Sequence, residues 1–203
     1  MCRQCLPHLP ECPAFNDGHG FLREPNDIAS YSALACIAIQ SNQNDQHGGQ
    51  SIPSFDYGLA DGVRKTFARR YWDNLTKTLE FSTDNQEGLV EKVRLACREI
   101  SERLQLKPEI TGSNGYLEEE FRVLSAVVNP ELLKKAQAYS LKQSLKETEK
   151  ATFQAMEALI HNLNTMHSRA GAQVPFSSIN YGTDISPEGR MVMKNIMLAT
   201  EAG

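Results

Sequence analysis

The first spacing that could carry chemistry is a pair of cysteines at the start of the chain. Cys2 and Cys5 form a CxxC pair, which can lower one thiol pKa, form a reversible disulfide or supply half of a zinc site. Cys12 and either His8 or His19 could be recruited, but their spacing fits no standard zinc pattern. The neighbouring prolines disfavour the helix that a thioredoxin-like motif requires. We therefore predict no metal site here.

A second candidate is a loop dense in carboxamides and glycines. Residues 43–51 read Gln-Asn-Asp-Gln-His-Gly-Gly-Gln-Ser. Carboxamides both donate and accept hydrogen bonds, and Gly48 and Gly49 let the backbone come close to a ligand. Such a loop suits a polyhydroxylated or nucleotide-like molecule. The alternative, a solvated surface loop, is slightly favoured by composition alone.

A third candidate is the segment that runs from the end of a long helix at about residue 164, through a strand, to the start of a further helix at Ser186. Arg169 could clamp an anion bidentately, and the start of the final helix offers a phosphate site. Ser177, Ser178 and Asn180 alternate along the strand, so part of this set must face away from the rest. A structural ion pair between Arg169 and Asp184 is an equally supported alternative.

Other chemistry-bearing residues fit no catalytic motif. The sequence has no Walker A run, GxGxxG, HExxH or GxSxG. His161 and His167 do not share a helix face as metal ligands would. Cys36 and Cys97 lie among apolar helical residues, which predicts core thiols rather than nucleophiles.

Helices must position most of these residues. Apolar residues recur at helical spacing over 27–42, with Asn26 as the predicted N-cap, and over 59–79 and 87–104. The best-signalled helix opens at Asn129-Pro130-Glu131. It could exceed about 30 residues, a length that usually indicates a helix pair in a larger assembly or a dimer surface.

One strand–turn–helix unit ends the chain. Residues 174–181 alternate strand-favouring and polar side chains, and the proline at position 175 suggests a strand start. Residues 182–184 turn the chain, and Ser186 caps a final helix that has Pro187 at its first position. The chain is therefore predicted to be mostly helical with few strands.

Composition excludes several classes of protein. The chain has 203 residues, of which 21 are basic and 25 acidic, so its net charge is −4. It has no membrane-length apolar run, no secretory signal, and no basic footprint for nucleic acid. Its odd count of five cysteines is unlike a disulfide scaffold, so we predict a reducing, cytoplasmic location.

Neither end of the chain has the sequence pattern expected at the end of a complete domain. Residues 1–14 contain three prolines and three cysteines without helical or strand periodicity, and we interpret them as a frame-shifted or corrupted stretch, with a floppy N-terminus as the alternative. The final helix has nothing after it to pack against. We therefore expect a fragment, with residues 15–203 as its ordered part.

Three irregular segments agree in order with one known family. They are residues 18–28 (GHGFLREPNDI), 40–53 (QSNQNDQHGGQSIP) and 166–184 (MHSRAGAQVPFSSINYGTD), the last continuing into 186–190 (SPEGR). Together they resemble the anaerobic (class III) ribonucleoside-triphosphate reductase, a glycyl radical enzyme. The resemblance runs from Phe15 to Gly203, while residues 1–14 match poorly.

The resemblance implies a fold and a reaction. The family has an α/β fold, a ten-stranded barrel with flanking helices, and residues 15–203 would supply an incomplete N-terminal part of it. Such enzymes work as homodimers. An activase that uses S-adenosylmethionine forms the glycyl radical, and ribonucleoside triphosphates become deoxyribonucleoside triphosphates for DNA synthesis. Formate or a thioredoxin-type dithiol is the reductant, and ATP and deoxynucleotides are allosteric effectors.

The resemblance also indicates which residues should take part in catalysis or in substrate binding. The family's radical glycine, thiyl cysteine and zinc site lie beyond Gly203, so we expect the fragment alone to be inactive. Cys2 is the candidate reducing-side cysteine, with Cys5 a poor second. The residues expected to line the substrate region are Gln46, His47, Gln50, Arg169, Gln173, Ser177 and Asn180. The alternative is a non-catalytic nucleotide-binding or dimerisation module, or a relic of a pseudogene.

Overall fold

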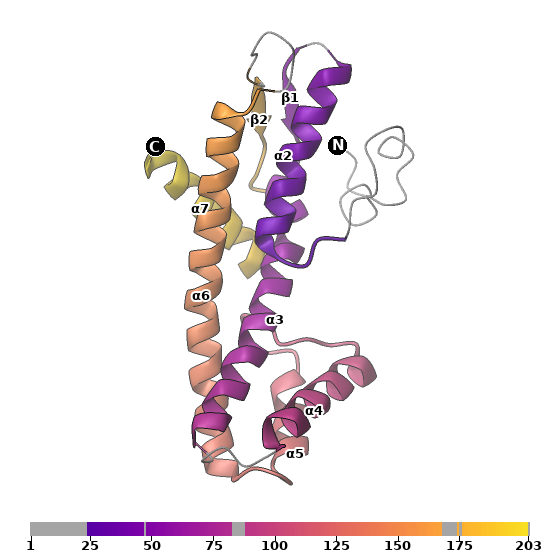
Figure 1. Cartoon of the computed structure of the whole chain (residues 1–203), viewed down its shortest axis with the longest axis vertical. Helices are drawn as coiled ribbons and strands as arrows, with labels where there is room; N and C mark the ends of the chain where they lie inside the picture. Colours follow the sequence, from indigo (N-terminus) through magenta and orange to yellow (C-terminus); the bar gives the residue numbers. More distant parts are fainter. Residues whose placement is uncertain (1–23, 47, 83–87, 168–173, 175, 203) are drawn as a thin grey trace. The chain divides into compact units, whose positions relative to one another are not determined.

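The computed structural model describes residues 24–46, 48–82, 88–167, 174 and 176–202. In chain order they form α2 (Ile28–Asp45), β1 (Gln50–Ile52), α3 (Phe55–Ser82), α4 (Leu89–Leu104), α5 (Tyr116–Leu124), α6 (Pro130–Thr165), β2 (Ser177–Ile179) and α7 (Pro187–Ala202) (Figure 1). The predicted mostly helical character is confirmed. The two described strands form a parallel pair, and the barrel stays a prediction.

The chain divides into two compact units, 1–63 with 151–203, and 64–150. Both boundaries fall inside long helices, so α3 and α6 each contribute a segment to both units. The long helix predicted from Asn129 onward is confirmed as α6, with 36 residues.

The first helix is confirmed, but its predicted N-cap is wrong by one residue. Asp27, not Asn26, has the extended backbone of a cap, and its Oδ1 accepts the Ser30 N–H at 2.9 Å. Its carboxylate also accepts the Ser30 hydroxyl at 2.7 Å. The two residues have similar cap preferences, so type alone could not decide between them.

The sequence patterns did not predict two of the elements that the structure contains. β1 begins within the stretch interpreted as a polar loop and ends one residue after it. It was missed because its three residues, Gln-Ser-Ile, are too few to show alternation. α5 was missed because its nine residues are too few for the repeated apolar spacing that marked the longer helices.

The unit of residues 1–63 and 151–203 packs α2 tightly against the first part of α3. A Cβ built on Gly62 would lie 2.9 Å from the Tyr31 ring and 3.1 Å from Ile28 Cα, so only glycine permits this approach. The Ser32 hydroxyl donates to the Ala155 carbonyl at 3.0 Å, which joins α2 to the last part of α6.

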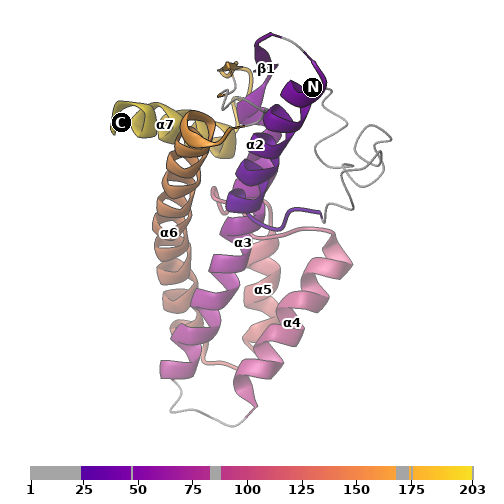
Figure 2. The same cartoon turned by 45° about the horizontal axis from the view of Figure 1, so that its top comes forward.

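The unit of residues 64–150 has its own hydrophobic core. Figures 1 and 2 both show α4 and α5 side by side, and the two helices are in contact. The fully buried side chains include Tyr71, Leu75, Val93, Tyr116 and Leu133. Between α3 and α6, Asn74 Nδ2 donates to Ser144 Oγ at 3.0 Å and to Glu147 Oε2 at 3.2 Å.

A buried carboxyl lies at the centre of this core. The Glu120 side chain is 0% exposed. Its Oε2 accepts the Tyr71 hydroxyl at 2.5 Å and Gln137 Nε2 at 2.9 Å, and its Oε1 lies 3.5 Å from the Cys97 thiol. Burial raises the pKa of Glu120 above its ordinary value, and these hydrogen bonds only partly oppose that rise.

This carboxyl should make stability fall as the pH rises. Above the ordinary pKa of 4.5, the folded state holds a proton that the unfolded state has lost, so the free energy of unfolding declines through the folded pKa. Glu120→Gln stays neutral and keeps an oxygen for Tyr71 and Gln137. We expect its unfolding free energy, relative to the parent chain, to increase between about pH 5 and pH 8 in denaturant titrations. Parallel pH profiles for the two chains would contradict this assignment.

Candidate functional site

The site is organised by the parallel pairing of β1 and β2, which lie side by side in Figure 1. Gln50 pairs with Ser177, Ser51 with Ser178, and Ile52 with Ile179. Backbone bonds continue beyond the strands. Asn180 N–H donates to the Ile52 carbonyl at 3.0 Å, and Phe55 N–H donates to the Asn180 carbonyl at 2.8 Å. Asn180 is therefore fixed at the carboxyl edge of both strands.

The two faces of this pair differ in polarity. Gln50 and Ile52 are buried on one face. On the other face Ser51, Ser178 and Asn180 are all exposed. The Ser178 hydroxyl donates to Ser51 Oγ at 3.1 Å, and Asn180 Nδ2 lies 3.5 Å from the same oxygen. We call these three residues the hydroxyl–amide face.

Asp56 holds the segment that follows β2. Its side chain is 0% exposed. Oδ2 accepts the Gly182 N–H at 2.9 Å and the Asp184 N–H at 2.8 Å, while the Thr183 hydroxyl lies 3.3 Å from Oδ1. A carboxylate on α3 thereby takes up the backbone donors of residues 182–184, which would otherwise be unpaired in a partly buried turn.

The hydrogen bonds decide the charge state of Asp56. Burial by itself would raise the pKa of this carboxyl, but the N–H groups of Asp184, Gly182 and Tyr57 and the Thr183 hydroxyl outweigh burial. They hold the pKa of Asp56 below its ordinary value. The group is therefore an anion at neutral pH, compensated by these donors.

The predicted cap of the final helix is confirmed, and a carboxylate lies beside it. Ser186 Oγ accepts the Gly189 N–H at 3.1 Å, and Asp184 Oδ1 accepts the Ser186 N–H at 2.8 Å. A Cβ on Gly189 would lie 2.5 Å from Asp184 Cγ, so glycine is required there. A phosphate approaching the start of α7 would meet the Asp184 carboxylate, which already compensates the helix dipole.

Four of the predicted substrate residues lie in the described part of the chain. Ser177 is the first residue of β2 and pairs with the buried Gln50, while Asn180 follows β2 and lies with Ser51 on the hydroxyl–amide face. Gln50 is 6% exposed; its Oε1 accepts Asn42 Nδ2, and its Nε2 donates to the Gly48 carbonyl at 3.4 Å. Gln46 is exposed and caps α2 through its backbone N–H. Cys2, His47, Arg169 and Gln173 lie outside the described residues.

Sequence reasoning missed two residues of this site. Ser51 belongs to the hydroxyl–amide face but was absorbed into the polar loop, where no strand was expected. Asp56 is the second residue of α3, and an acidic residue there is explained by the helix dipole alone. Only the folded chain shows that its carboxylate bonds a segment more than a hundred residues away.

The chemistry of this arrangement is that of polar recognition. The hydroxyl–amide face offers two hydroxyls and a carboxamide, which donate and accept hydrogen bonds without carrying charge. Within the described residues, no group of three or more His, Cys, Asp or Glu side chains could hold a metal ion. No helix in the same part of the chain has the length and hydropathy to cross a membrane.

Removing the charge of Asp56 should loosen this site. Asp56→Asn keeps one acceptor but turns an amide N–H toward a backbone donor, so we expect a loss of about 2 kcal/mol in the free energy of unfolding. Because the folded pKa of Asp56 is depressed, its contribution is present above the ordinary value of 3.8 and is lost as the pH falls through the folded pKa. The acid sensitivity should therefore shrink in the variant.

Denaturant titrations between about pH 2 and pH 7 would measure this difference. Asp73→Asn, at an exposed position on the same helix, is the matched control and should change stability little. If Asp56→Asn and Asp73→Asn had equal effects at every pH, Asp56 would not hold the 182–184 segment.

Comparison with known proteins gives one match and one negative result. A family model described as "Anaerobic ribonucleoside-triphosphate reductase" matches residues 14–203. No match was found among curated proteins. The matched range contains the whole β1–β2 pair, Asp56 and both segments that flank the hydroxyl–amide face.

Proposed function

We propose, since the chain belongs to the anaerobic ribonucleoside-triphosphate reductase family, that it forms a substrate-holding part of an enzyme that converts ribonucleoside triphosphates to deoxyribonucleoside triphosphates. The family implies glycyl radical chemistry. We assign the described residues to holding the nucleotide rather than to the radical steps. The single observation that carries this assignment is the exposed hydroxyl–amide face of a parallel strand pair, which reaches the carboxyl edge of the strands at Asn180.

The position of this face supports a ligand site. In open parallel α/β sheets, ligands bind outside the carboxyl ends of the strands. Ile52 and Ile179 end the two strands in register, and the segments that follow them lead into α3 and α7. Asn180 lies at this edge, where its backbone is fixed by Ile52 and Phe55. A fixed carboxamide loses little conformational entropy when it binds a ligand.

The chemistry of the face supports a nucleotide. Ribose hydroxyls and phosphate oxygens are partners for the hydroxyls of Ser51 and Ser178 and for the amide of Asn180. Asp56 is buried and surrounded by N–H donors, so it presents little repulsion to a triphosphate. The Asp184 carboxylate lies at the start of α7, so the phosphates should lie away from that helix end. His47, Arg169 and Gln173 remain proposed members of the same site.

The same proposal includes the partners of such an enzyme. They are a second copy of the chain, an activase that forms the radical with S-adenosylmethionine, and formate or a dithiol as reductant. ATP and deoxynucleotides are the proposed effectors, and Cys2 is the proposed cysteine on the reducing side. A cytoplasmic location belongs to this proposal too.

Adding a negative charge to the hydroxyl–amide face should weaken nucleotide binding. Asn180→Asp preserves the backbone bonds of residue 180 but opposes a triphosphate, so we expect roughly tenfold weaker binding. Isothermal titration calorimetry with ATP, CTP, GTP and UTP would measure it on the whole chain. Circular dichroism would verify that the variant keeps its fold.

Gln154→Glu is the matched control, because it adds the same charge at an exposed position on α6. It should leave the affinity almost unchanged. If none of the four nucleotides bound saturably, or if both variants bound like the parent chain, the proposed nucleotide-holding role would be wrong.

A further inference from the structure

A second site is present in the unit of residues 64–150. A cavity of about 500 Å³ lies between α3 and α4, which is within the usual range for small-molecule pockets. One face of α4, which includes Arg94 and Cys97, forms one wall. Trp72 and Thr76 of α3 form the other, and Lys107 lies at the border.

Three lining residues that we call the floor of the cavity, Trp72, Thr76 and Ser101, have polar groups that are already hydrogen-bonded within the chain. The Trp72 indole N–H donates to the Tyr116 hydroxyl at 2.9 Å. Thr76 Oγ1 donates to the Trp72 carbonyl at 2.7 Å, and Ser101 Oγ donates to the Cys97 carbonyl at 2.9 Å. The Cys97 thiol lies 3.5 Å from Glu120 Oε1 in the core. An indole ring and a methyl group thus remain for a ligand.

The ring of Trp72 is held in place before any ligand arrives. Its hydrogen-bond partner Tyr116 is completely buried, and the Tyr116 hydroxyl in turn lies 3.5 Å from the Cys97 carbonyl. A fixed indole provides a stacking surface at low entropic cost. The floor therefore suits a flat aromatic ring.

The border of the cavity has an excess of positive charge. Arg98 Nε pairs with Glu102 Oε1 at 3.0 Å, so these two lining residues compensate each other. Of the remaining charged lining residues, Arg94 and Lys107 are cationic and Asp73 is anionic. Within the described part of the chain, none of these three takes part in an ion pair.

We propose that this cavity binds a flat aromatic molecule that carries an anionic group, with its ring on Trp72 and its anion toward Arg94 and Lys107. The cavity lies wholly within one unit and shares no residue with the hydroxyl–amide face. The inference therefore stands independently of the proposed reductase function.

The test uses 1-naphthyl phosphate as the probe, with neutral 1-naphthol and inorganic phosphate as its separate halves. Trp72 is the sole tryptophan of the chain, so its indole N–H gives one resonance in a ¹⁵N-labelled sample. We expect saturable shifts of this resonance with 1-naphthyl phosphate, and much weaker binding of either half.

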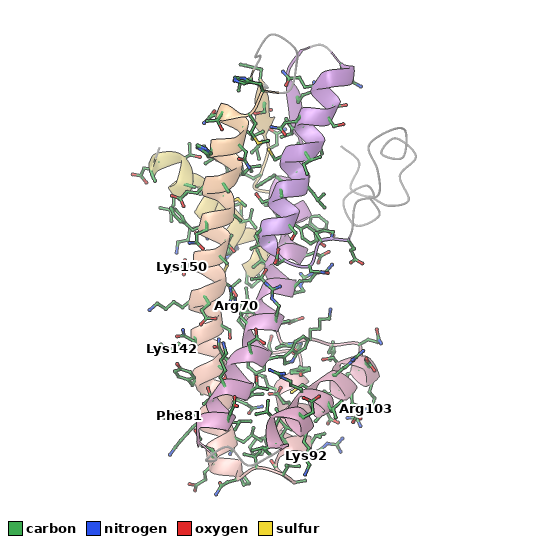
Figure 3. The ribbon with its side chains drawn as sticks, in the orientation of Figure 1. Arg70, Phe81, Lys92, Arg103, Lys142 and Lys150 are labelled. Carbon is green, nitrogen blue, oxygen red and sulfur yellow. The ribbon has the colours of Figure 1, made fainter. Side chains whose placement is uncertain are left out.

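Removing a positive charge and removing a negative charge from the cavity lining should change the affinity for 1-naphthyl phosphate in opposite directions. Arg94→Gln should weaken 1-naphthyl phosphate binding roughly tenfold, as expected for one lost charge-assisted hydrogen bond. Asp73→Asn should strengthen it about threefold by removing the opposing charge. Lys92→Gln is the control, since Lys92 lies on α4 outside the cavity lining; Figure 3 labels it near one end of the helix, with Arg103 near the other.

Three results would overturn the proposal. The first is the absence of a saturable shift of the Trp72 resonance. The second is equal binding by 1-naphthol and 1-naphthyl phosphate, which would remove the role of the anion. The third is an affinity that Arg94→Gln and Asp73→Asn leave unchanged, which would place the probe elsewhere on the chain.

Discussion

The bonds between the buried Asp56 carboxylate and the segment after β2 are the interaction on which the site depends. The strands themselves are three residues each, and an isolated pair of this size is marginal in water. Asp56 adds two backbone N–H bonds and a hydroxyl contact just beyond the strands. Because these donors lie in residues 182–184, the carboxylate fixes where Asn180 and the start of α7 are placed.

Two buried carboxyl groups in this chain show how partners decide charge. Asp56 is surrounded by backbone N–H donors that favour its anion, and its pKa is lowered. Glu120 accepts bonds from a phenol, a carboxamide and a thiol, yet burial prevails and its pKa is raised. The first group therefore organises a segment next to the proposed nucleotide site. The second lets the core of the other unit bury a polar side chain in neutral form.

The sequence predicted long elements well and short ones poorly, for a physical reason. The long helix from Asn129 has a strong cap and no glycine or proline after Pro130, and it is present as α6. β1 has three residues and α5 has nine, so each is too short to repeat a pattern over several turns or alternations. Alternation required part of the set Ser177, Ser178 and Asn180 to face away from the rest, but it did not show which residues share a face with Ser51. Ser51 and Asp56 could not be found, because their roles come from contacts across more than a hundred residues.

The central claim is that the hydroxyl–amide face holds a ribonucleoside triphosphate. Chemical-shift mapping of the ¹⁵N-labelled chain with CTP tests it most directly, because every backbone N–H reports separately. The account predicts that the largest shifts fall on Ser51, Ser178, Asn180 and Gly182 and saturate together. Saturable binding with the largest shifts on α4 or α5, and none on the β1–β2 pair, would contradict it.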